Sequence, residues 1–423
     1  MLIEFRVENH RSVRDEQVLT MEAGRVGDAN DERPRTVQGH QNPLLTVAGL
    51  YGPNASGKSN VLSAIAFMRE AVLRSHRAWP PDEGVPRDPF AWGAKRSEPS
   101  TFEVTVLVDA TRYEYGFVAT DAEFIEEWLH AWPHGKKQLW FAREAGRFKF
   151  GENLKGENAL IEEVTRPNAL FLSAAVQHKH VQLQPIFSWF QSLQAIRVPS
   201  PRRSPFQTAW GSEFAVAELF EESRQSTLFE TETEEPFLER FRAMLRNADI
   251  GIVDLRVIKS EPDDSSRRVR PPRFEFKHHA DTNDAWLPFQ EESRGTQTLF
   301  RITLPILRAI QRGSTLVLDE LEASLHPSLA EKIVRQFNDA RTNPRNAQLI
   351  FTTHDTNLLG TTLGEPALRR DQTWLTEKDP NGATVLYPLT DYKPRKAENL
   401  ERGYLQGRYG AIPFLGNFAI TGQ

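Results

Sequence analysis

Residues 47–65 read VAGLYGPNASGKSNVLSAI, and this stretch decides the fold. Its apolar first residues predict a buried β-strand. A helix is expected to begin near Lys58, because apolar residues then recur at helical spacing. Between them, Gly52, Gly57, Lys58 and Ser59 match the pattern G-x-x-x-x-G-K-[S/T]. Between a strand and a helix, that pattern is typical of a phosphate-binding loop. The sequence therefore predicts a mononucleotide site at the end of this strand.

The residue types of this loop (the P-loop) explain how it would hold ATP and Mg²⁺. Glycines let backbone N–H groups wrap the phosphates, a lysine reaches the β- and γ-phosphate oxygens, and the serine hydroxyl ligates the metal. Lys58 is therefore expected to serve catalysis as well as binding, and Ser59 to be a metal ligand. We expect nine consecutive residues to bind the nucleotide: Gly52, Pro53, Asn54, Ala55, Ser56, Gly57, Lys58, Ser59 and Asn60.

A second stretch, STLVLDELEASLHP (314–327), supplies the acids that such a loop needs. Its apolar residues predict a buried strand ending in Asp319, whose carboxylate can hold the metal or its waters. The adjacent Glu320 can polarise a water in line with the γ-phosphate, which favours hydrolysis over phosphoryl transfer to a substrate. His354 follows another predicted strand, in AQLIFTTHD (347–355), where it can hydrogen-bond the γ-phosphate. These residues predict an ATPase.

The composition is that of a globular protein. The 423 residues are 39% hydrophobic and 26% charged and include no cysteine. No run of eighteen apolar residues predicts a transmembrane helix. The lack of cysteine excludes disulfides and thiolate metal sites and, with no signal-like N-terminus, favours a cytoplasmic location. The net charge of −5 argues against binding nucleic acid over the whole surface, so any DNA contact would need a local basic patch.

The rest of the chain alternates between β-rich and helical stretches. Period-two patterns predict an N-terminal hairpin and an antiparallel sheet over 101–151. Residues 169–177, ALFLSAAVQ, are interpreted as another core strand. Residues 178–249 read as mostly helical, and 250–290 as strand-like pieces around a disorder-prone SEPDDSSRRVRPPR. The helix and strand patterns over 295–355 are expected to return to the parallel sheet.

Three motifs together resemble the ABC-type ATPases of the SMC, RecF and OLD kind. They are residues 52–59, Asp319–Glu320 with the following LEASLHP, and TTHD (352–355). The resemblance covers residues 1–75 and 285–360 approximately and is specific there, whereas the middle of the chain is similar only in layout. It implies an α/β fold with a mixed central sheet, flanking helices, an antiparallel β-subdomain and an inserted helical lobe.

This resemblance divides the chain into four parts. Residues 1–177 would form the N-terminal half of the ATPase head, and 178–290 a mainly helical lobe. Residues 291–360 would complete the head. Residues 361–423 would form a C-terminal hairpin and a basic tail, and the hairpin is expected at the Asn-Gly turn of EKDPNGATVLYPL. The coiled coil of the family is missing, because no heptads are sustained in the middle of the chain. The residues after 360 are too few for the nuclease domain that OLD proteins carry.

In this family two heads sandwich two ATP molecules, and each head offers a serine-glycine signature to the γ-phosphate of its partner. The matching stretch is EESRGTQTLF (291–300), in which Ser293 and Gly295 open a helix whose N–H groups can meet an anion. It keeps only the serine and the second glycine of L-S-G-G-Q, and a plain helix N-cap is the alternative. The implied assembly is a homodimer or a higher even oligomer.

The resemblance assigns two further residues. The family has a glutamine after a core strand that contacts Mg²⁺ and the attacking water, and Gln177 is the candidate here. A surface glutamine without this role is the alternative. The opening VENHRSV (7–13) resembles the first strand of the family, whose loop lies near the nucleotide, so Arg11 is a candidate nucleotide contact.

The stretch DYKPRKAENLERGYLQGRYGAIPFL (391–415) interleaves basic and aromatic residues. Such a pattern can grip phosphates and stack bases, or it can pack on its own head or dock a partner. It resembles the ending of stand-alone ATPases from bacterial two-gene phage-defence systems of the Rlo and PARIS type. In those systems a separate companion protein is the nuclease or toxin effector. Two more basic runs, at residues 202–203 and 267–273, are interpreted either as solvated loops or as DNA contacts.

The sequence thus favours a cytoplasmic ABC-type ATPase that dimerises around ATP and Mg²⁺. As a hypothesis, it is a switch that holds and releases an effector when phage infection is sensed. A RecF-like ATPase in DNA repair stays open and should bind DNA with a steep salt dependence. The ATP-binding subunit of a transporter also stays open and should copurify with a membrane partner. The Asp319–Glu320 pair argues against a scaffold that does not hydrolyse ATP.

Overall fold

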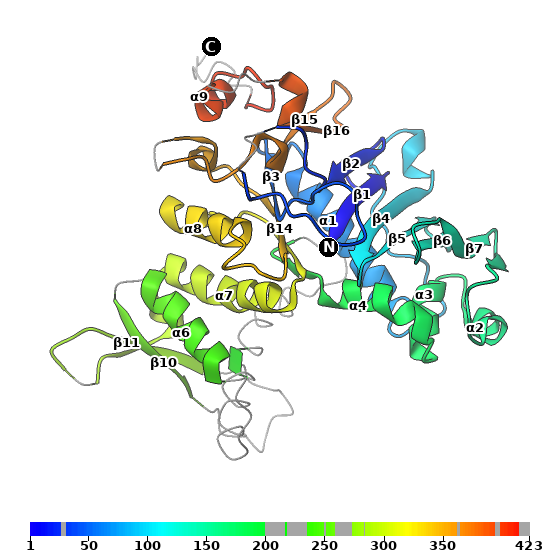
Figure 1. The fold of residues 1–423 in the computed structure, drawn as a ribbon, viewed down its shortest axis with the longest axis horizontal. Coiled ribbons are helices and arrows are strands. Elements are labelled where there is room, and N and C mark those ends of the chain that lie inside the picture. Colours follow the sequence, from blue (N-terminus) through cyan, green and yellow to red (C-terminus); the bar gives the residue numbers. More distant parts are fainter. Residues whose placement is uncertain are drawn as a thin grey trace, which may run out of the picture.

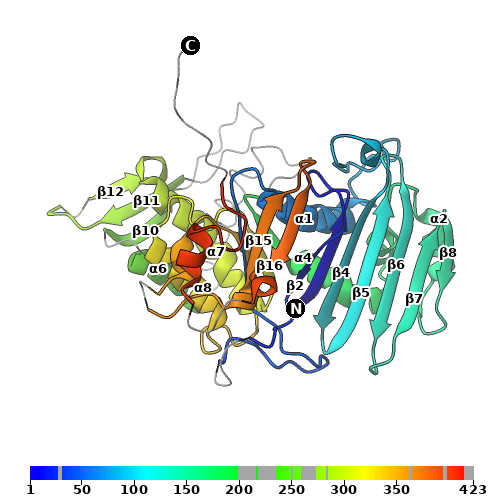
Figure 2. The same cartoon turned by 90° about the horizontal axis from the view of Figure 1, so that it is seen from above.

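The structure is a computed structural model that describes residues 1–26, 31–198, 216–217, 235–248, 251–258, 273–282, 284–361, 364–393 and 398–413. Two large β-sheets stand next to each other, with helices between and around them, and a smaller lobe extends from one side (Figure 1, Figure 2). None of the described helices is both long and apolar enough to cross a membrane.

A six-stranded sheet carries the predicted P-loop. Its order is β16-β15-β3-β14-β13-β9, with β14 between the strand that leads into the P-loop and the strand that leads into Asp319. All neighbouring strands are parallel except β15 and β16. Because parallel strands end at one edge, the P-loop and the acids meet there. The strands are β3 (Val47–Tyr51), β9 (Gln194–Ile196), β13 (Thr315–Leu318), β14 (Gln348–Thr352), β15 (Thr373–Lys378) and β16 (Thr384–Pro388).

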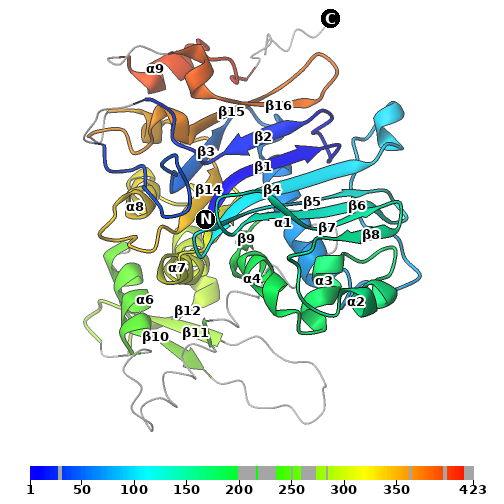
Figure 3. The same cartoon turned by 45° about the vertical axis from the view of Figure 1, so that its right-hand side comes forward.

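The second sheet is antiparallel and has seven strands in the order β2-β1-β4-β5-β6-β7-β8. It confirms both the N-terminal hairpin and the antiparallel sheet predicted over 101–151. Figure 3 shows it lying across α1. Its strands are β1 (Leu2–Glu8), β2 (Gln17–Thr20), β4 (Ser100–Val108), β5 (Thr111–Ala119), β6 (Phe124–Trp132), β7 (Gln138–Glu144) and β8 (Arg147–Phe150).

Alternation along the central strands gives the six-stranded sheet two apolar faces. Leu50, Val317 and Ile350 face a core shared with α1 and the antiparallel sheet. Their neighbours Leu316 and Phe351 face the opposite core, which contains α7 and α8. The helices around these cores are α1 (Lys58–Arg74), α2 (Asn158–Val164), α3 (Phe171–Gln177), α4 (Gln184–Ser192), α7 (Arg294–Arg312) and α8 (Pro327–Asn338).

A smaller lobe combines α6 (Glu235–Ala248) with a three-stranded antiparallel sheet, β10 (Ile252–Ile258), β11 (Arg273–His278) and β12 (Trp286–Pro288). It packs on α7 through a cluster of aromatic rings, in which Phe300 of α7 touches Phe241, Phe274, Phe276 and Phe289. Figure 1 shows this lobe below α7.

The C-terminal part packs on the head. The predicted hairpin is formed by β15 and β16, and α9 (Leu400–Leu405) follows it. Tyr404 of α9 lies edge-on to Tyr51, with ring centroids 5.8 Å apart. The described part of the tail therefore packs on the head of the same chain, which confirms that prediction. The described residues also form single-turn 3₁₀ helices: η1 (Ala94–Arg96), η2 (Val181–Leu183), η3 (Phe289–Glu291), η4 (Thr356–Leu359), η5 (Arg370–Gln372) and η6 (Leu389–Tyr392).

Two sequence predictions about the elements differ from the structure. Residues 169–177 are not a core strand, because Phe171–Gln177 forms helix α3. The buried carboxylate of Glu127 accepts hydrogen bonds from the N–H groups of Phe171 (2.6 Å) and Leu172 (3.1 Å), which stabilises the helix start. The span 178–290 is also not purely a lobe, because it contains β9 of the head sheet. The basic runs 202–203 and 267–272 lie outside the described residues.

Candidate nucleotide site

The P-loop takes a shape that two glycines make available. Gly52 and Gly57 have φ values of 151° and 108°, in the region that disfavours other residues. A Cβ at Gly57 would lie 1.9 Å from the Thr384 hydroxyl oxygen, so space also restricts this position. Gly57 ends the loop, and α1 begins at Lys58, as predicted. The sequence motif therefore corresponds to a backbone that can expose its N–H groups to phosphates.

Lys58 reaches back across the P-loop. Its ammonium donates hydrogen bonds to the carbonyl oxygens of Gly52 (2.7 Å) and Pro53 (3.1 Å). Burial lowers the pKa of Lys58 to about 8, against the opposite influence of Asp319 and Glu322. A buried cation inside the P-loop is suited to bind phosphate oxygens. These carry a full negative charge, which the neutral carbonyls of the loop lack.

Ser59 and Asp319 converge where Mg²⁺ is expected. The Ser59 hydroxyl donates to Asp319 Oδ1 at 3.0 Å, and the Thr352 hydroxyl donates to the same oxygen at 2.5 Å. Proteins usually hold Mg²⁺ through one or two side chains together with substrate phosphates, and two such side chains meet here. Ser59 and Asp319 are the residues that would hold it, and the metal would neutralise charge on the phosphates.

Glu320 lies at the exposed edge with an unusual backbone. Its φ of 53° is left-handed, which is uncommon for a residue with a side chain. Its N–H donates to the Thr352 hydroxyl (2.7 Å), and its carbonyl accepts from Arg197 Nη1 (3.0 Å). The neighbouring strands β14 and β9 therefore hold the peptide groups on both sides of Glu320. The carboxylate stays exposed, as a base that must meet water and nucleotide requires.

His354 follows β14 and stands close to the same charges. Its backbone N–H donates to Glu322 Oε1 at 2.7 Å. Partial burial and the charge of Lys58 lower the pKa of His354, while Glu322 and Glu320 act in the opposite direction. The histidine is therefore favoured in its neutral form, which can either donate to or accept from a phosphate or water.

Ser293 and Gly295 open α7, as predicted, and the alternative of a plain N-cap is also realised. The Ser293 hydroxyl accepts a hydrogen bond from Thr296 N (3.1 Å). A Cβ at Gly295 would lie 2.8 Å from the Ser324 carbonyl oxygen, in the segment that follows the acids. Ser293 itself is exposed. The start of α7 is thus packed against the segment that follows Asp319 and Glu320, with its serine exposed.

Arg11 is held by an acid rather than by the P-loop. Its Nε pairs with Asp88 Oδ2 at 3.1 Å. The next residue, Ser12, contacts the P-loop, because its hydroxyl accepts from Asn60 Nδ2 (2.6 Å), and it also contacts the Thr384 hydroxyl (2.7 Å). The loop between β1 and β2 therefore lies near the P-loop, and Ser12 makes the contact. A nucleotide contact of Arg11 stays a prediction.

Gln177 lies far from the P-loop. It is the last residue of α3 rather than the end of a strand. The ring of the next residue, His178, lies 6.0 Å from that of His76, just beyond the far end of α1. The 17 residues of α1 separate that end from Lys58, which is about 25 Å at 1.5 Å per residue. The expected contact of Gln177 with Mg²⁺ is therefore wrong.

The model of one protein family matches residues 47–360, which is more than half of the chain. The family, AAA_21, is described as "AAA domain, putative AbiEii toxin, Type IV TA system". The chain belongs to this family. Its P-loop and its Asp319–Glu320 pair, at one edge of a mixed sheet, agree with a nucleotide-binding AAA domain. No curated protein matches the chain.

Several solved structures are similar to the chain at low identity. One is an SMC head bound to the C-winged helix domain of ScpA, with 12% identity, a TM-score of 0.49, and 92% of this chain and 99% of that chain covered. Another is the SMC head domain from Thermotoga maritima, with 12% identity, a TM-score of 0.40, and 92% and 98% covered. A third is the Smc head domain with an extended coiled coil bound to the C-terminal domain of ScpA, from Pyrococcus furiosus. It has 11% identity, a TM-score of 0.37, and 93% and 97% covered.

Three residues at this site escaped the sequence analysis. Thr352 belongs to the TTHD motif without a predicted role, yet its hydroxyl joins Asp319 to Glu320. Thr384, 327 residues after Gly57, backs the P-loop by donating to the Ser56 carbonyl at 2.8 Å. Arg197 lies in a stretch expected to be helical. The repeated threonine directly before His354 is a signal that could have pointed to the first of these.

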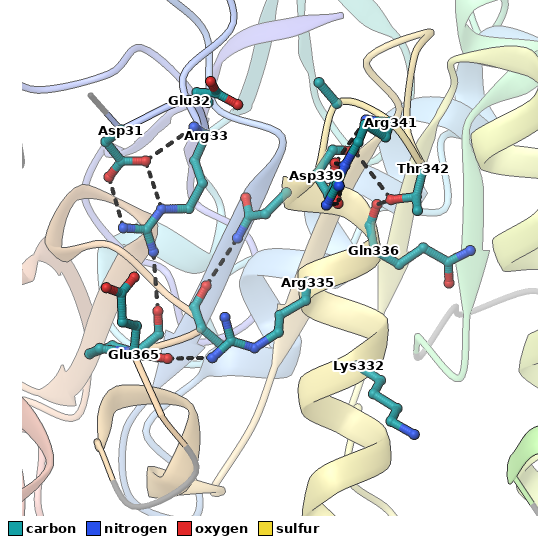
Figure 4. Close-up of a pocket in the computed structure, with 14 residues that line it drawn as sticks. Asp31, Glu32, Arg33, Lys332, Arg335, Gln336, Asp339, Arg341, Thr342 and Glu365 are labelled. Carbon is teal, nitrogen blue, oxygen red and sulfur yellow. Dashed lines mark hydrogen bonds and ion pairs between the residues drawn. The ribbon is translucent and has the colours of Figure 1, made fainter. Parts of the chain in front are cut away.

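A pocket of about 1010 Å³ lies at the opposite edge of the central sheet (Figure 4). It is formed by the loop before β3, the C-terminal half of α8 and residues 365–367. Its three arginines are already paired with acids, Arg33 with Asp31, Arg335 with Glu331 and Arg341 with Asp339, each at 2.7 Å. Mixed charge and distance from the P-loop exclude it as the ATP site.

Proposed function

We propose that the protein hydrolyses ATP with Mg²⁺, using Glu320 to activate water. The observation that carries this proposal is the meeting of Lys58, Ser59, Asp319 and Glu320 at one sheet edge. Lys58 would bind the β- and γ-phosphates, and Ser59 and Asp319 would hold the metal. Glu320 would take the proton of the attacking water, and the neutral His354 would hydrogen-bond the γ-phosphate.

We further propose that two heads close around two ATP molecules. Support comes from Ser293, which is exposed at the start of a 19-residue helix, where an anion is favoured by free N–H groups and the helix dipole. The γ-phosphate on one head would meet Ser293 and Gly295 of the other. Because these contacts exist only before hydrolysis, the cycle would be a two-state switch.

The proposed biological role is anti-phage defence, with the switch controlling a separate nuclease or toxin effector after infection is sensed. Two observations support it. The description of the family names a toxin and a "Type IV TA system", and the C-terminal stretch 391–415 resembles the ending of ATPases from two-gene defence systems. A DNA contact is not required for this role.

The test measures phosphate release from ATP and Mg²⁺, and phage plating on cells that carry the gene with its genomic neighbours. Glu320→Gln should lower kcat at least about 100-fold, the usual range for losing a general base, and should abolish protection. The matched control Glu163→Gln, exposed on α2, should behave like the wild type. Equal turnover in wild type and Glu320→Gln would contradict the assigned chemistry. Turnover without protection would contradict the defence role alone.

A further inference from the structure

Arg197 stands at the same sheet edge as the two acids, although nothing in its local sequence marks it. It directly follows β9, which pairs in parallel with β13 so that Ile196 lies opposite Leu318. The Asp319 N–H donates to the Ile196 carbonyl at 3.2 Å. The end of β9 is thus fastened to the point where β13 delivers Asp319 and Glu320.

The side chain of Arg197 contacts Glu320, the residue that follows Asp319. Its Nη1 donates to the carbonyl oxygen of Glu320 at 3.0 Å. Arg197 and Glu320 both have left-handed backbones, with φ values of 58° and 53°. Such conformations cost free energy in residues with side chains and persist where surrounding contacts hold them. The bond from Arg197 is one such contact, and the bond from Glu320 N to the Thr352 hydroxyl is the other.

Arg197 also brings a permanent positive charge to this edge. Its guanidinium carries five N–H donors and stays protonated. Burial lowers the pKa of Arg197, whereas Glu320, Asp319 and Glu322 raise it, so the group stands within the field of all three acids. Arg301 of α7 is the cation that faces it. Among the described residues, the bond to Glu320 is the hydrogen bond that this side chain makes.

We propose that Arg197 is a positioning residue that holds Glu320 in the geometry needed to activate water. The proposal rests on the hydrolytic function proposed above. By fixing the carbonyl of Glu320, Arg197 fixes the left-handed turn and therefore the direction in which the carboxylate leaves the backbone. Displacing a catalytic group by about 1 Å can cost about 100-fold in rate. Arg197 acts through Glu320, so its effect exists only while Glu320 can act.

The test compares Arg197→Ala with the wild type in phosphate release and in binding of a fluorescent ATP analogue. We expect kcat to fall about 10- to 100-fold, with KM and nucleotide affinity changed less than about threefold. Arg197→Lys keeps a charge and a donor and should recover most of the lost rate. The matched control Arg74→Ala removes an arginine paired with Glu70 at the far end of α1 and should leave kcat unchanged.

The decisive arm places Arg197→Ala in the Glu320→Gln background. If Arg197 acts through Glu320, the residual rate should change less than about threefold there. An equal loss in both backgrounds would overturn the proposal, and so would an unchanged kcat in Arg197→Ala or a matching loss of ATP affinity. If Arg197→Ala does not fold, as judged by circular dichroism, Arg197→Gln takes its place. A wild type without turnover would overturn the hydrolytic function itself. This outcome is distinct from an active wild type whose rate does not depend on Arg197.

Discussion

Lys58 carries its ammonium group inside the P-loop, where it donates to the carbonyls of Gly52 and Pro53. Burial brings its pKa down to about 8, so the charge that attracts phosphate is lost as the pH rises through 8. We predict that wild-type affinity for a fluorescent ATP analogue is nearly constant below pH 8. Above pH 8 it should weaken by up to about tenfold per pH unit.

The control for this prediction is Lys58→Arg, measured from pH 7 to 9.5. A guanidinium stays protonated over this range, so the remaining affinity of the variant should not change with pH. A wild type whose affinity is flat up to pH 9.5 would show that the Lys58 charge does not govern binding.

Thr352 joins the two acids through a single hydroxyl, which donates to Asp319 and accepts from Glu320 N. Thr352→Val keeps the shape and removes both bonds, leaving a buried carboxylate oxygen and an N–H group with one partner fewer. We predict a loss of about 1–3 kcal/mol in the free energy of unfolding, measured by urea denaturation, together with a lower kcat. Thr105→Val, buried in β4, removes a hydroxyl outside this network and should cost less. Equal effects of the two substitutions would contradict this role.

At the residue scale, the sequence predicted those members of the site that belong to contiguous motifs. Lys58, Ser59, Asp319 and Glu320 meet as expected, because the P-loop and the two acids follow the ends of β3 and β13, which run in the same direction in one sheet. Arg197 could not be predicted, because its contact with Glu320 spans 123 residues and depends on strand pairing. Gln177 was misplaced because the assignment relied on a strand that does not exist.

At the scale of elements, the C-terminal hairpin and α9 support the P-loop from behind. Ser56 Oγ contacts the Thr376 hydroxyl of β15 at 2.6 Å, and Thr356 Oγ1, just after the His354 segment, donates to Glu401 of α9 at 3.1 Å. The tail therefore connects both sides of the nucleotide edge. It belongs to the structure of the head.

Tyr404→Ala tests this structural role of the tail. The ring is buried against Tyr51, so its loss should lower the free energy of unfolding by about 3 kcal/mol, in the range of large aromatic truncations. Tyr392→Ala, at a residue that is 44% exposed, should cost less than about 1 kcal/mol. Thermal unfolding measures both. If Tyr404→Ala left stability unchanged but weakened DNA binding, the tail would be a nucleic-acid contact instead.

The elements that sequence analysis predicted are those with a clear period or a local signal. β3, α1, β13, α8 and β14 follow in the expected order. ALFLSAAVQ was misassigned because a short apolar run fits a buried strand and a buried helix equally well. The buried Glu127 lies 44 residues before Phe171 and favours the helix, because its carboxylate accepts hydrogen bonds from the first N–H groups of α3. β9 has only three residues, too few for a period to show.

At the scale of the whole molecule, the account requires a second copy of the chain. Ser293 is the residue that would contact the γ-phosphate on the partner, and it also caps α7. Ser293→Asp keeps a good N-cap but places a negative charge against that phosphate. In the Glu320→Gln background we predict unchanged ATP binding and at least about tenfold weaker dimerisation, measured by analytical ultracentrifugation.

Ser293→Asn is the matched variant, because it caps equally well without the charge. It should dimerise like its Glu320→Gln parent. Loss of dimerisation in both variants would point to the hydroxyl alone, and retention in both would remove Ser293 from the interface.

The central claim is tested most directly by mass photometry of the wild type and Glu320→Gln, each with and without ATP and Mg²⁺. The account predicts that Glu320→Gln binds ATP, does not turn it over, and accumulates as particles of twice the 48.2 kDa chain mass or a higher even multiple. The wild type should show such particles only transiently. A Glu320→Gln protein that stays monomeric with ATP bound, or that still hydrolyses ATP, would contradict the switch.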